Sequence, residues 1–332
     1  MTLPLFSTRG NPIMPATPTP ETVAVARTRD WPPLPLAEWR PTLDTLHLWT
    51  QIVGKTSLAL APMVNHWWQV TLAVSARGLR TRPLPSKGGV FDLEFDFVDH
   101  RLVARAGADA TASISLSPQP VAEFYREYLA MLRKLDVECA MWPVPVEMVE
   151  AIPFAEDFTH ASYDADAVSR FRRVLVESNR VFEIFRGRFL GKVSPVQFFW
   201  GGFDLACTRF SGRPAPRHPG GVPHCPDYVM IEAESHENFS AGWWPGSPDG
   251  PVREPAYYAY AYPEPDGSAA AAIRPREARY DRDMREFILP YEAVRTARDP
   301  DAMLLAFLQS TYEVSANLGR WDRERLERAP VP

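Results

Sequence analysis

The stretch FDLEFDFVDH, residues 91–100, determines the fold class. Large apolar residues alternate in it with acidic ones: Phe91, Leu93, Phe95 and Phe97 with Asp92, Glu94 and Asp96. Because successive side chains of a β-strand point to opposite faces, this alternation predicts a strand with one buried and one solvated face. Such a strand is typical of an antiparallel sheet that helices cover on one side.

Helical patterns stand on both sides of this strand. Residues 42–53 carry apolar side chains at helical intervals, and a second helix is predicted to begin near Pro120. Between these helices we expect strands over residues 66–79, 91–100 and 110–116.

The second half of the chain repeats this order. A long helix is capped by Asp164 or Asp166, and a last helix opens with Asp299 as its cap and a proline in its first position. Strands are predicted between them, over residues 196–210, 227–237 and 256–262.

A repeated spacing indicates an internal duplication. Trp68 and Arg77 lie 132 residues before Trp200 and Arg209. We therefore predict a single α+β domain over residues 29–325 with a central antiparallel sheet. It would consist of two pseudo-repeated helix–antiparallel-strands–helix halves, at about 29–150 and 151–325, with a ligand cleft between them.

Composition excludes several classes of protein. The chain has 332 residues, and its 34 prolines argue against an all-helical bundle. A net charge of −5 provides no basic field for nucleic acid, and no apolar run approaches the about 18 residues that span a bilayer. Residues 1–28, rich in proline and threonine, are predicted to form a disordered arm.

The cysteines and the first residues indicate a compartment. Cys139, Cys207 and Cys225 are too few and too widely spaced for a disulfide framework. The first thirty residues lack the charged and then apolar profile of a secretory signal. We therefore expect a cytoplasmic protein with reduced thiols.

Several runs of the chain resemble a known family. They are WPPLP (31–35), TLHLWTQIVGK (45–55), NHWWQVTL (65–72), PVQFFWGGFDLACTRFSGR (195–213) and SHENFSAGWWPG (235–246). These runs are similar to those of a bacterial family, domain of unknown function 5996, from about Trp31 to Arg328. The resemblance implies no particular activity, so every expectation about function rests on the residues themselves.

A metal site is the first candidate. If residues 229–237 form a strand, Glu232, Glu234 and His236 share one face, and His100 follows the acidic face of the first half. Carboxylates with an imidazole suit a divalent metal, namely iron, manganese or zinc. The alternative is that these residues only form the solvated face of a sheet.

Catalytic and substrate-binding residues are predicted around the same strand. His236, Glu237 and His66 are the candidate catalytic groups, and His236 precedes a loop that carries Trp243 and Trp244. Residues expected to enclose or anchor a substrate are aromatic, acidic or basic: Trp68, Trp200, Asp204, Arg77, Arg209, Trp243 and Trp244. The alternatives are core packing for the tryptophans and ion pairs with the acidic strand faces for the arginines.

Two functions follow from these candidates. The first is an enzyme that acts on a small organic substrate in an aromatic cleft with a histidine–carboxylate site. The second is a non-catalytic small-molecule-binding or scaffold protein that uses the same cleft. A role of the proline-rich arm in binding a protein partner is a third possibility.

Overall fold

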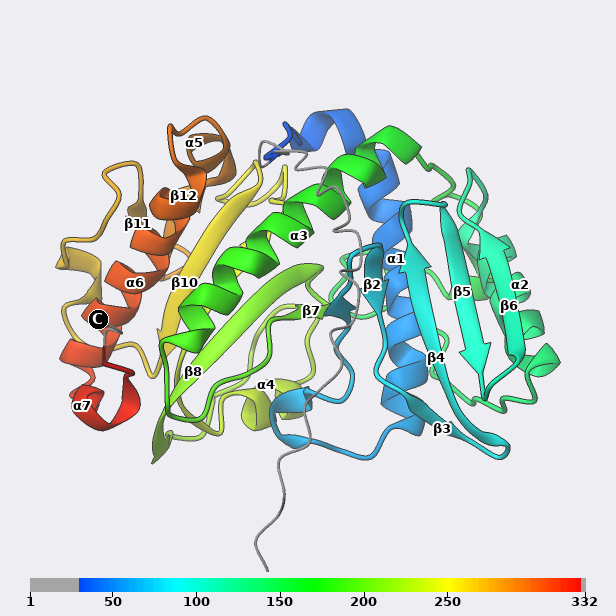
Figure 1. Ribbon diagram of the computed structural model, residues 1–332, viewed down its shortest axis with the longest axis horizontal. Coiled ribbons are helices and arrows are strands. Elements are labelled where there is room, and N and C mark those ends of the chain that lie inside the picture. Colours follow the sequence, from blue (N-terminus) through cyan, green and yellow to red (C-terminus); the bar gives the residue numbers. More distant parts are fainter. Residues whose placement is uncertain (1–29, 330–332) are drawn as a thin grey trace, which may run out of the picture. The chain divides into compact units, whose positions relative to one another are not determined.

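The computed structural model describes residues 30–329, so the predicted disordered arm lies outside the described residues (Figure 1). In this range the chain combines α-helices with two antiparallel sheets, as the predicted α+β class requires. The α-helices are α1 (Leu36–Leu60), α2 (Val121–Lys134), α3 (Ala165–Gly187), α4 (Asp227–Ala233), α5 (Tyr291–Arg295), α6 (Pro300–Leu318) and α7 (Arg323–Leu326). Within residues 30–329, every helix is too short or too polar to span a bilayer.

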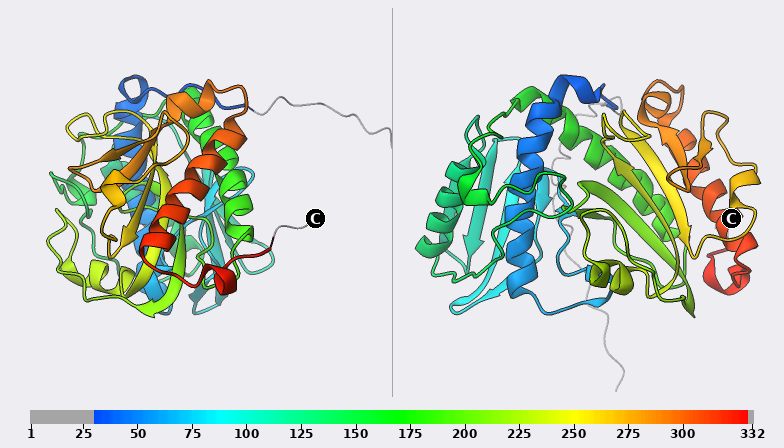
Figure 2. Two further views of the ribbon diagram at one scale, coloured as in Figure 1. Left: turned by 90° about the vertical axis from the view of Figure 1, so that its left-hand side faces the viewer. Right: turned by 180° about the vertical axis from the view of Figure 1, so that it is seen from behind.

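The first sheet contains the predicted alternating strand. Its strands are β1 (Ala73–Val74), β2 (Gly78–Arg80), β3 (Leu84–Ser86), β4 (Gly89–Asp96), β5 (Arg101–Ala106) and β6 (Ala110–Ser115). They follow the order β1-β2-β4-β5-β6, and β3 pairs with β4. Helices α1 and α2 lie along one face of this sheet (Figure 2). Phe91, Leu93 and Phe95 of β4 are buried, as predicted. Glu94 and Asp96 are buried as well, so the opposite face of β4 is not the solvated face that the alternation predicts.

The second sheet forms the floor of a cavity. Its strands are β7 (Gln197–Phe199), β8 (Asp204–Pro214), β9 (His236–Trp244), β10 (Ala256–Tyr262), β11 (Arg279–Asp281) and β12 (Glu286–Pro290), in the order β11-β12-β10-β9-β8-β7. Helices α3 and α6 pack on one face (Figure 1). The strand residues that point to these helices, such as Cys207, Phe239 and Tyr257, are fully buried.

A single central sheet was wrong, because the two sheets meet at one point only. Leu72 and Phe198 exchange two backbone hydrogen bonds, of 2.9 and 2.7 Å, in an isolated antiparallel bridge. Leu72 directly precedes β1 and Phe198 lies within β7, and these strands have only two and three residues, so no continuous ladder joins the sheets.

Helix α3 carries the centre of the hydrophobic core. The ring of Phe171 stacks on Phe203 at 5.3 Å and also contacts Trp39, Phe97 and Trp243, which come from both halves of the chain. The predicted caps are confirmed for two helices: the Asp164 side chain accepts two backbone N–H bonds at the start of α3, and Asp299 accepts one at the start of α6.

The segment 227–237 is not the predicted strand. Residues Asp227–Ala233 form α4, which begins directly after Pro226, and β9 begins only at His236. A run of apolar residues this short has no periodicity that separates a strand from a helix. Two consequences follow: Glu232, Glu234 and His236 do not share a strand face, and the tryptophans of 243–244 lie in a strand instead of a loop.

Candidate functional site

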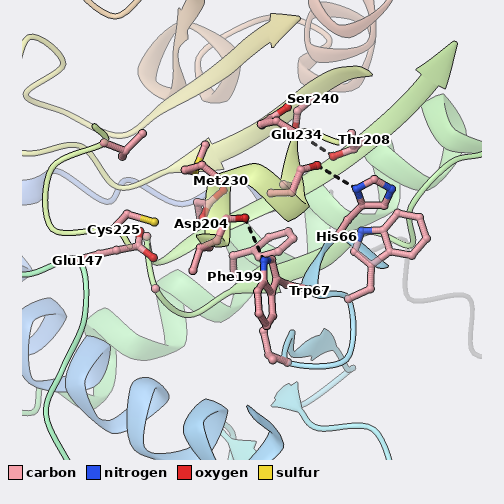
Figure 3. A pocket seen from close by; sticks show the side chains of 18 of the residues that line it. His66, Trp67, Glu147, Phe199, Asp204, Thr208, Cys225, Met230, Glu234 and Ser240 are labelled. Atoms are coloured by element: carbon pink, nitrogen blue, oxygen red, sulfur yellow. Dashed lines mark hydrogen bonds between the residues drawn. The ribbon is translucent and has the colours of Figure 1, made fainter. Parts of the chain in front are cut away.

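A cavity of about 330 Å³ lies on the face of the second sheet that is turned away from α3 and α6 (Figure 3). This volume is within the range of small-molecule sites. Its floor consists of alternate residues of three strands: Asp204, Ala206 and Thr208 of β8, Asn238 and Ser240 of β9, and Tyr258 and Tyr260 of β10. Its walls come from α4, from the turn η1 (Asn65–Trp67) and from α1.

Hydrogen bonds join the polar groups of the floor. The Tyr258 hydroxyl donates to Asp204, and the Tyr260 hydroxyl donates to Glu234 at 3.1 Å. Asn238 Nδ2 also donates to Glu234, at 2.5 Å. Burial raises the pKa of Asp204 to about 6 and also raises the pKa of Glu234. The floor therefore holds carboxyl groups that gain a proton more readily than carboxyl groups in water.

Two further charged groups line the cavity from other elements. Glu147 stands at the mouth, where it remains open to water. The surrounding protein removes part of the water around its carboxylate, and this loss of solvation together with the negative charge of Asp204 raises the pKa of Glu147 to about 7. Lys55 of α1 is 3% exposed, with its ammonium 5.9 Å from the centre of the Trp200 ring, and burial lowers its pKa to about 8. Carboxyl and amino groups with pKa values near neutrality are typical of functional sites.

His66 holds the wall of the cavity together. Its backbone N–H donates to the Glu232 carboxylate at 3.0 Å, and its Nδ1 lies 2.9 Å from the Ala233 carbonyl. Its Nε2 lies 2.6 Å from the Lys192 ammonium. The carbonyl requires a donor at Nδ1 and the ammonium requires an acceptor at Nε2, so His66 is the neutral tautomer that carries its proton on Nδ1. Burial lowers the pKa of His66, which agrees with this assignment.

The structure brings together part of the predicted histidine–carboxylate site. The rings of His66 and His236 lie 5.7 Å apart, edge to face, and Glu232 is bonded to the His66 backbone. His100 lies in the turn between β4 and β5 of the first sheet, where its Nδ1 is 2.8 Å from the Tyr163 hydroxyl. Residues 30–329 contain no group of three or more His, Cys, Asp or Glu side chains that could hold a metal ion.

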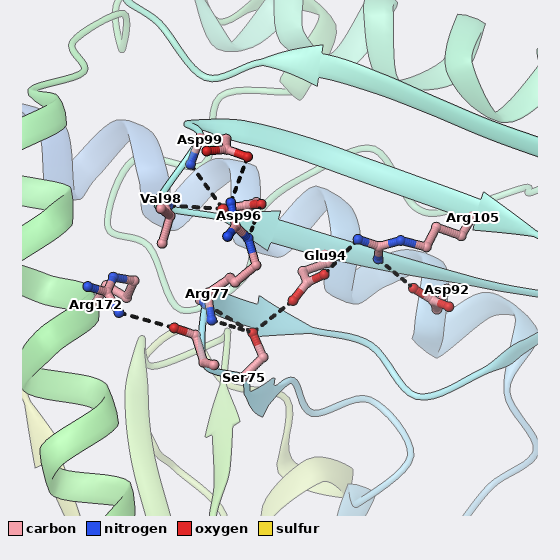
Figure 4. Close-up of polar contacts among 11 residues, drawn as sticks. Ser75, Arg77, Asp92, Glu94, Asp96, Val98, Asp99, Arg105 and Arg172 are labelled. Atoms are coloured by element: carbon pink, nitrogen blue, oxygen red, sulfur yellow. Dashed lines mark hydrogen bonds and ion pairs between the residues drawn. The ribbon is translucent and has the colours of Figure 1, made fainter. Parts of the chain in front are cut away.

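Arg77 lies in a different place from the predicted anchor. It stands in the turn before β2 and pairs with Asp96 at 2.5 Å and with Asp99 at 2.6 Å (Figure 4). On the same face of the first sheet, Arg105 pairs with Glu94 at 2.9 Å and with Asp92 at 3.3 Å. The acidic face of β4 is thus compensated by arginines, which is the alternative that the sequence left open.

Arg209 is a core residue and does not line the cavity. It lies in the middle of β8 and points to the helices, with its guanidinium carbon 3.4 Å from the centre of the Phe185 ring and 4.3 Å from that of Tyr312. It is fully buried and donates to the Phe185 carbonyl. Arg77 and Arg209 therefore do not occupy equivalent positions, although their spacing in the sequence suggested it.

The other predicted residues divide between the cavity and its surroundings. Trp68, Trp200 and Asp204 line the cavity. Trp243 is fully buried on the helix side of β9, and Trp244, on the opposite side, lines a smaller hollow next to the cavity. Glu237 pairs with Arg213 at 2.6 Å and is not among the lining residues.

Sequence reasoning missed Lys55, Glu147, Tyr258 and Tyr260. In the run AYYAYAY (256–262), strand alternation puts Tyr258, Tyr260 and Tyr262 on one face, and this signal could have identified them. Lys55 follows Gln51 and Ile52 at helical spacing, which places a charge on the buried side of the first helix. Glu147 lies in an irregular segment with positive φ, and no pattern identifies it.

Comparison with known proteins gives one result. Neither the curated proteins nor the solved structures contain a match to this chain. One family model, described as a family of unknown function (DUF5996), matches residues 31–328. The match covers nearly all of the chain, including every strand and every wall of the cavity, so the chain belongs to the DUF5996 family.

Proposed function

We propose that this protein is an enzyme that binds a small organic molecule in the cavity and acts on it by proton transfer. The observation that carries the proposal is the Asp204–Tyr258 pair on the floor, beneath walls that are largely aromatic. With a pKa of about 6, Asp204 can both accept and release a proton near neutral pH. The Tyr258 hydroxyl orients this carboxylate.

Aromatic side chains supply the contacts for the substrate body. Trp67, Trp68 and Trp200 line the cavity, and the Trp200 indole is held by a 2.8 Å bond to the Val70 carbonyl. A fixed aromatic ring offers a large apolar surface at low entropic cost. The proposal gives the acid–base role to Asp204, which the sequence assigned to substrate binding, and not to the predicted His236. It assigns no role to a metal, because the described residues gather no three-ligand group.

The second candidate is a binding protein without chemistry. The observation that favours it is the internal bonding of the floor, where Tyr258 and Tyr260 already satisfy Asp204 and Glu234. A carboxylate that stays bonded to a tyrosine would fix a ligand without reacting with it.

Incubation with a metabolite extract separates the two candidates. Purified protein is mixed with a bacterial small-molecule extract, and mass spectrometry follows compounds that disappear and compounds retained by the protein. For an enzyme we expect turnover that Asp204→Asn lowers at least about 100-fold, while retention of the compound persists. The matched control is Asp92→Asn, because Asp92 is a half-exposed residue of the first sheet and does not line the cavity, and it should leave turnover unchanged. Retention without turnover would establish the binding protein instead.

We also infer an internal duplication and a cytoplasmic location. Each half contains a long helix, six antiparallel strands and a further helix: α1, β1–β6, α2 and then α3, β7–β12, α6, with α4 and α5 as additional helices of the second half. This common order supports the duplication, although the positions of Arg77 and Arg209 do not.

The three unpaired cysteines support the cytoplasmic location, because free thiols are typical of a reducing compartment.

A further inference from the structure

We infer that the cavity binds a small organic acid with one carboxylate, which pairs with the Lys55 ammonium, and with a hydroxyl or amino group that donates to Asn238. This inference rests on the proposed function and names the class of ligand for the same cavity. It is carried by two buried polar groups that line the cavity and have no partner in the described chain.

The first group is the Lys55 ammonium. Its side chain is 3% exposed and lines the cavity next to Trp200. Within residues 30–329 no carboxylate and no hydrogen-bond acceptor pairs with this ammonium; its one polar contact is with the Trp200 ring at 5.9 Å. Burial of an unpaired charge is unfavourable, so an anion that enters the cavity gains a partner that the protein leaves free.

The second group is the side-chain oxygen of Asn238. This residue is 2% exposed, and its Nδ2 donates to Glu234 at 2.5 Å and to the His236 carbonyl at 3.0 Å. These two acceptors fix the orientation of the amide, because only the nitrogen can donate. No described group donates to Asn238 Oδ1, so a hydroxyl or amino group of a ligand would satisfy it.

The charges around the cavity favour a single negative charge on the ligand. Glu147, Asp204 and Glu234 line the same space as Lys55. A phosphate ester with two negative charges would face all three carboxyl groups and find one cation. A monocarboxylate matches that cation, and its apolar body fits against Trp67 and Trp200.

Paired compounds test this inference. Phenyllactate, mandelate and tyrosine are each compared with their primary amides. Each amide keeps the shape of the acid and its hydroxyl or amino donor, but it lacks the negative charge of the carboxylate. Calorimetry and thermal unfolding measure affinity for the wild type, Lys55→Met and Lys134→Met. Lys134 is an exposed lysine of α2 and provides the matched control. We expect at least one acid to bind the wild type about ten-fold or more tighter than its amide. Lys55→Met should remove this preference and Lys134→Met should keep it.

Other outcomes would contradict either the anion site alone or the whole cavity. If amides bind the wild type as tightly as acids, or if Lys55→Met keeps the preference, the anion site is wrong and the small-molecule cavity stands. If no acid and no amide binds, both the inference and the proposed function fail.

A measurement on the wild type alone tests the same pairing without any substitution. Acetylation of Lys55 is followed by peptide mass spectrometry, with Lys134 as the internal reference. The bound acid should slow acetylation of Lys55 relative to Lys134. Equal protection by the acid and by its amide would overturn the pairing with the carboxylate.

Discussion

At the scale of single residues, Lys55 carries the clearest cost to stability. Burial lowers its pKa from 10.5 to about 8, so the unfolded chain holds the proton more tightly than the folded one. The resulting destabilisation is complete below about pH 8 and disappears as the pH rises to the unfolded pKa.

Lys55→Met should therefore raise the free energy of unfolding at neutral pH, by at most about 3 kcal/mol. The advantage over the wild type should shrink between about pH 8 and pH 10.5, because the wild type gains stability in this window as Lys55 loses its proton. Urea unfolding of both proteins across this range measures the difference. A difference that does not change with pH would contradict the buried ammonium, and Lys134→Met should show no difference at any pH.

Parity within a strand explains which residues could be assigned to the site from the sequence. Asp204 and Arg209 are five positions apart in β8, so their side chains point to opposite faces. Assigning both to one substrate was therefore inconsistent with a regular strand, and the structure places only Asp204 in the cavity. Lys55 required knowledge of what covers the first helix, which is a contact between segments far apart in the chain.

At the scale of elements, the long helices and the alternating strand β4 could be predicted and α4 could not. The strand predicted over residues 66–79 was also wrong, because this segment forms η1, a turn and the short strands β1 and β2. The strand β4 and the caps Asp164 and Asp299 depend on neighbouring residues only, which the sequence displays directly. Helix α4 has seven residues and none of them is buried, so no buried face marks it as a helix. Its conformation depends on its contacts with η1, a turn about 160 residues earlier.

The bonds between η1 and α4 should control the mobility of this wall. The Trp67 indole donates to the Val229 carbonyl at 3.0 Å, beside the two His66 bonds to α4. Trp67→Phe removes the indole donor and should cost about 1 kcal/mol. We expect faster hydrogen exchange in residues 227–233 with little change in β8 and β9.

Trp142→Phe is the matched control, because Trp142 is exposed and has no role in the wall. It should leave exchange in α4 unchanged. If Trp67→Phe does not alter exchange in 227–233, the wall is held by other contacts than these bonds.

At the scale of the whole described chain, the order of strands within each sheet was easier to predict than the separation into two sheets. Strands that follow one another along the chain pair as neighbours in most of both sheets, as in a meander. The boundary between the two sheets depends on the bridge between Leu72 and Phe198 and on the packing of α3. Both are contacts between distant segments, so no local pattern of the sequence predicts them.

Phe171 joins the cores of the two sheets, and its removal should destabilise both together. Its ring contacts Trp39 and Phe97 from the first half and Phe203 and Trp243 from the second. Phe171→Ala should lower the free energy of unfolding by about 3–5 kcal/mol while unfolding remains one transition. Hydrogen exchange should show equal loss of protection in β4 and in β9, whereas Ile184→Ala, an exposed position of the same helix, should change neither. Loss of protection in one sheet alone would mean that the halves unfold as separate units, and residues 29–325 would then not behave as the single domain that the sequence predicts.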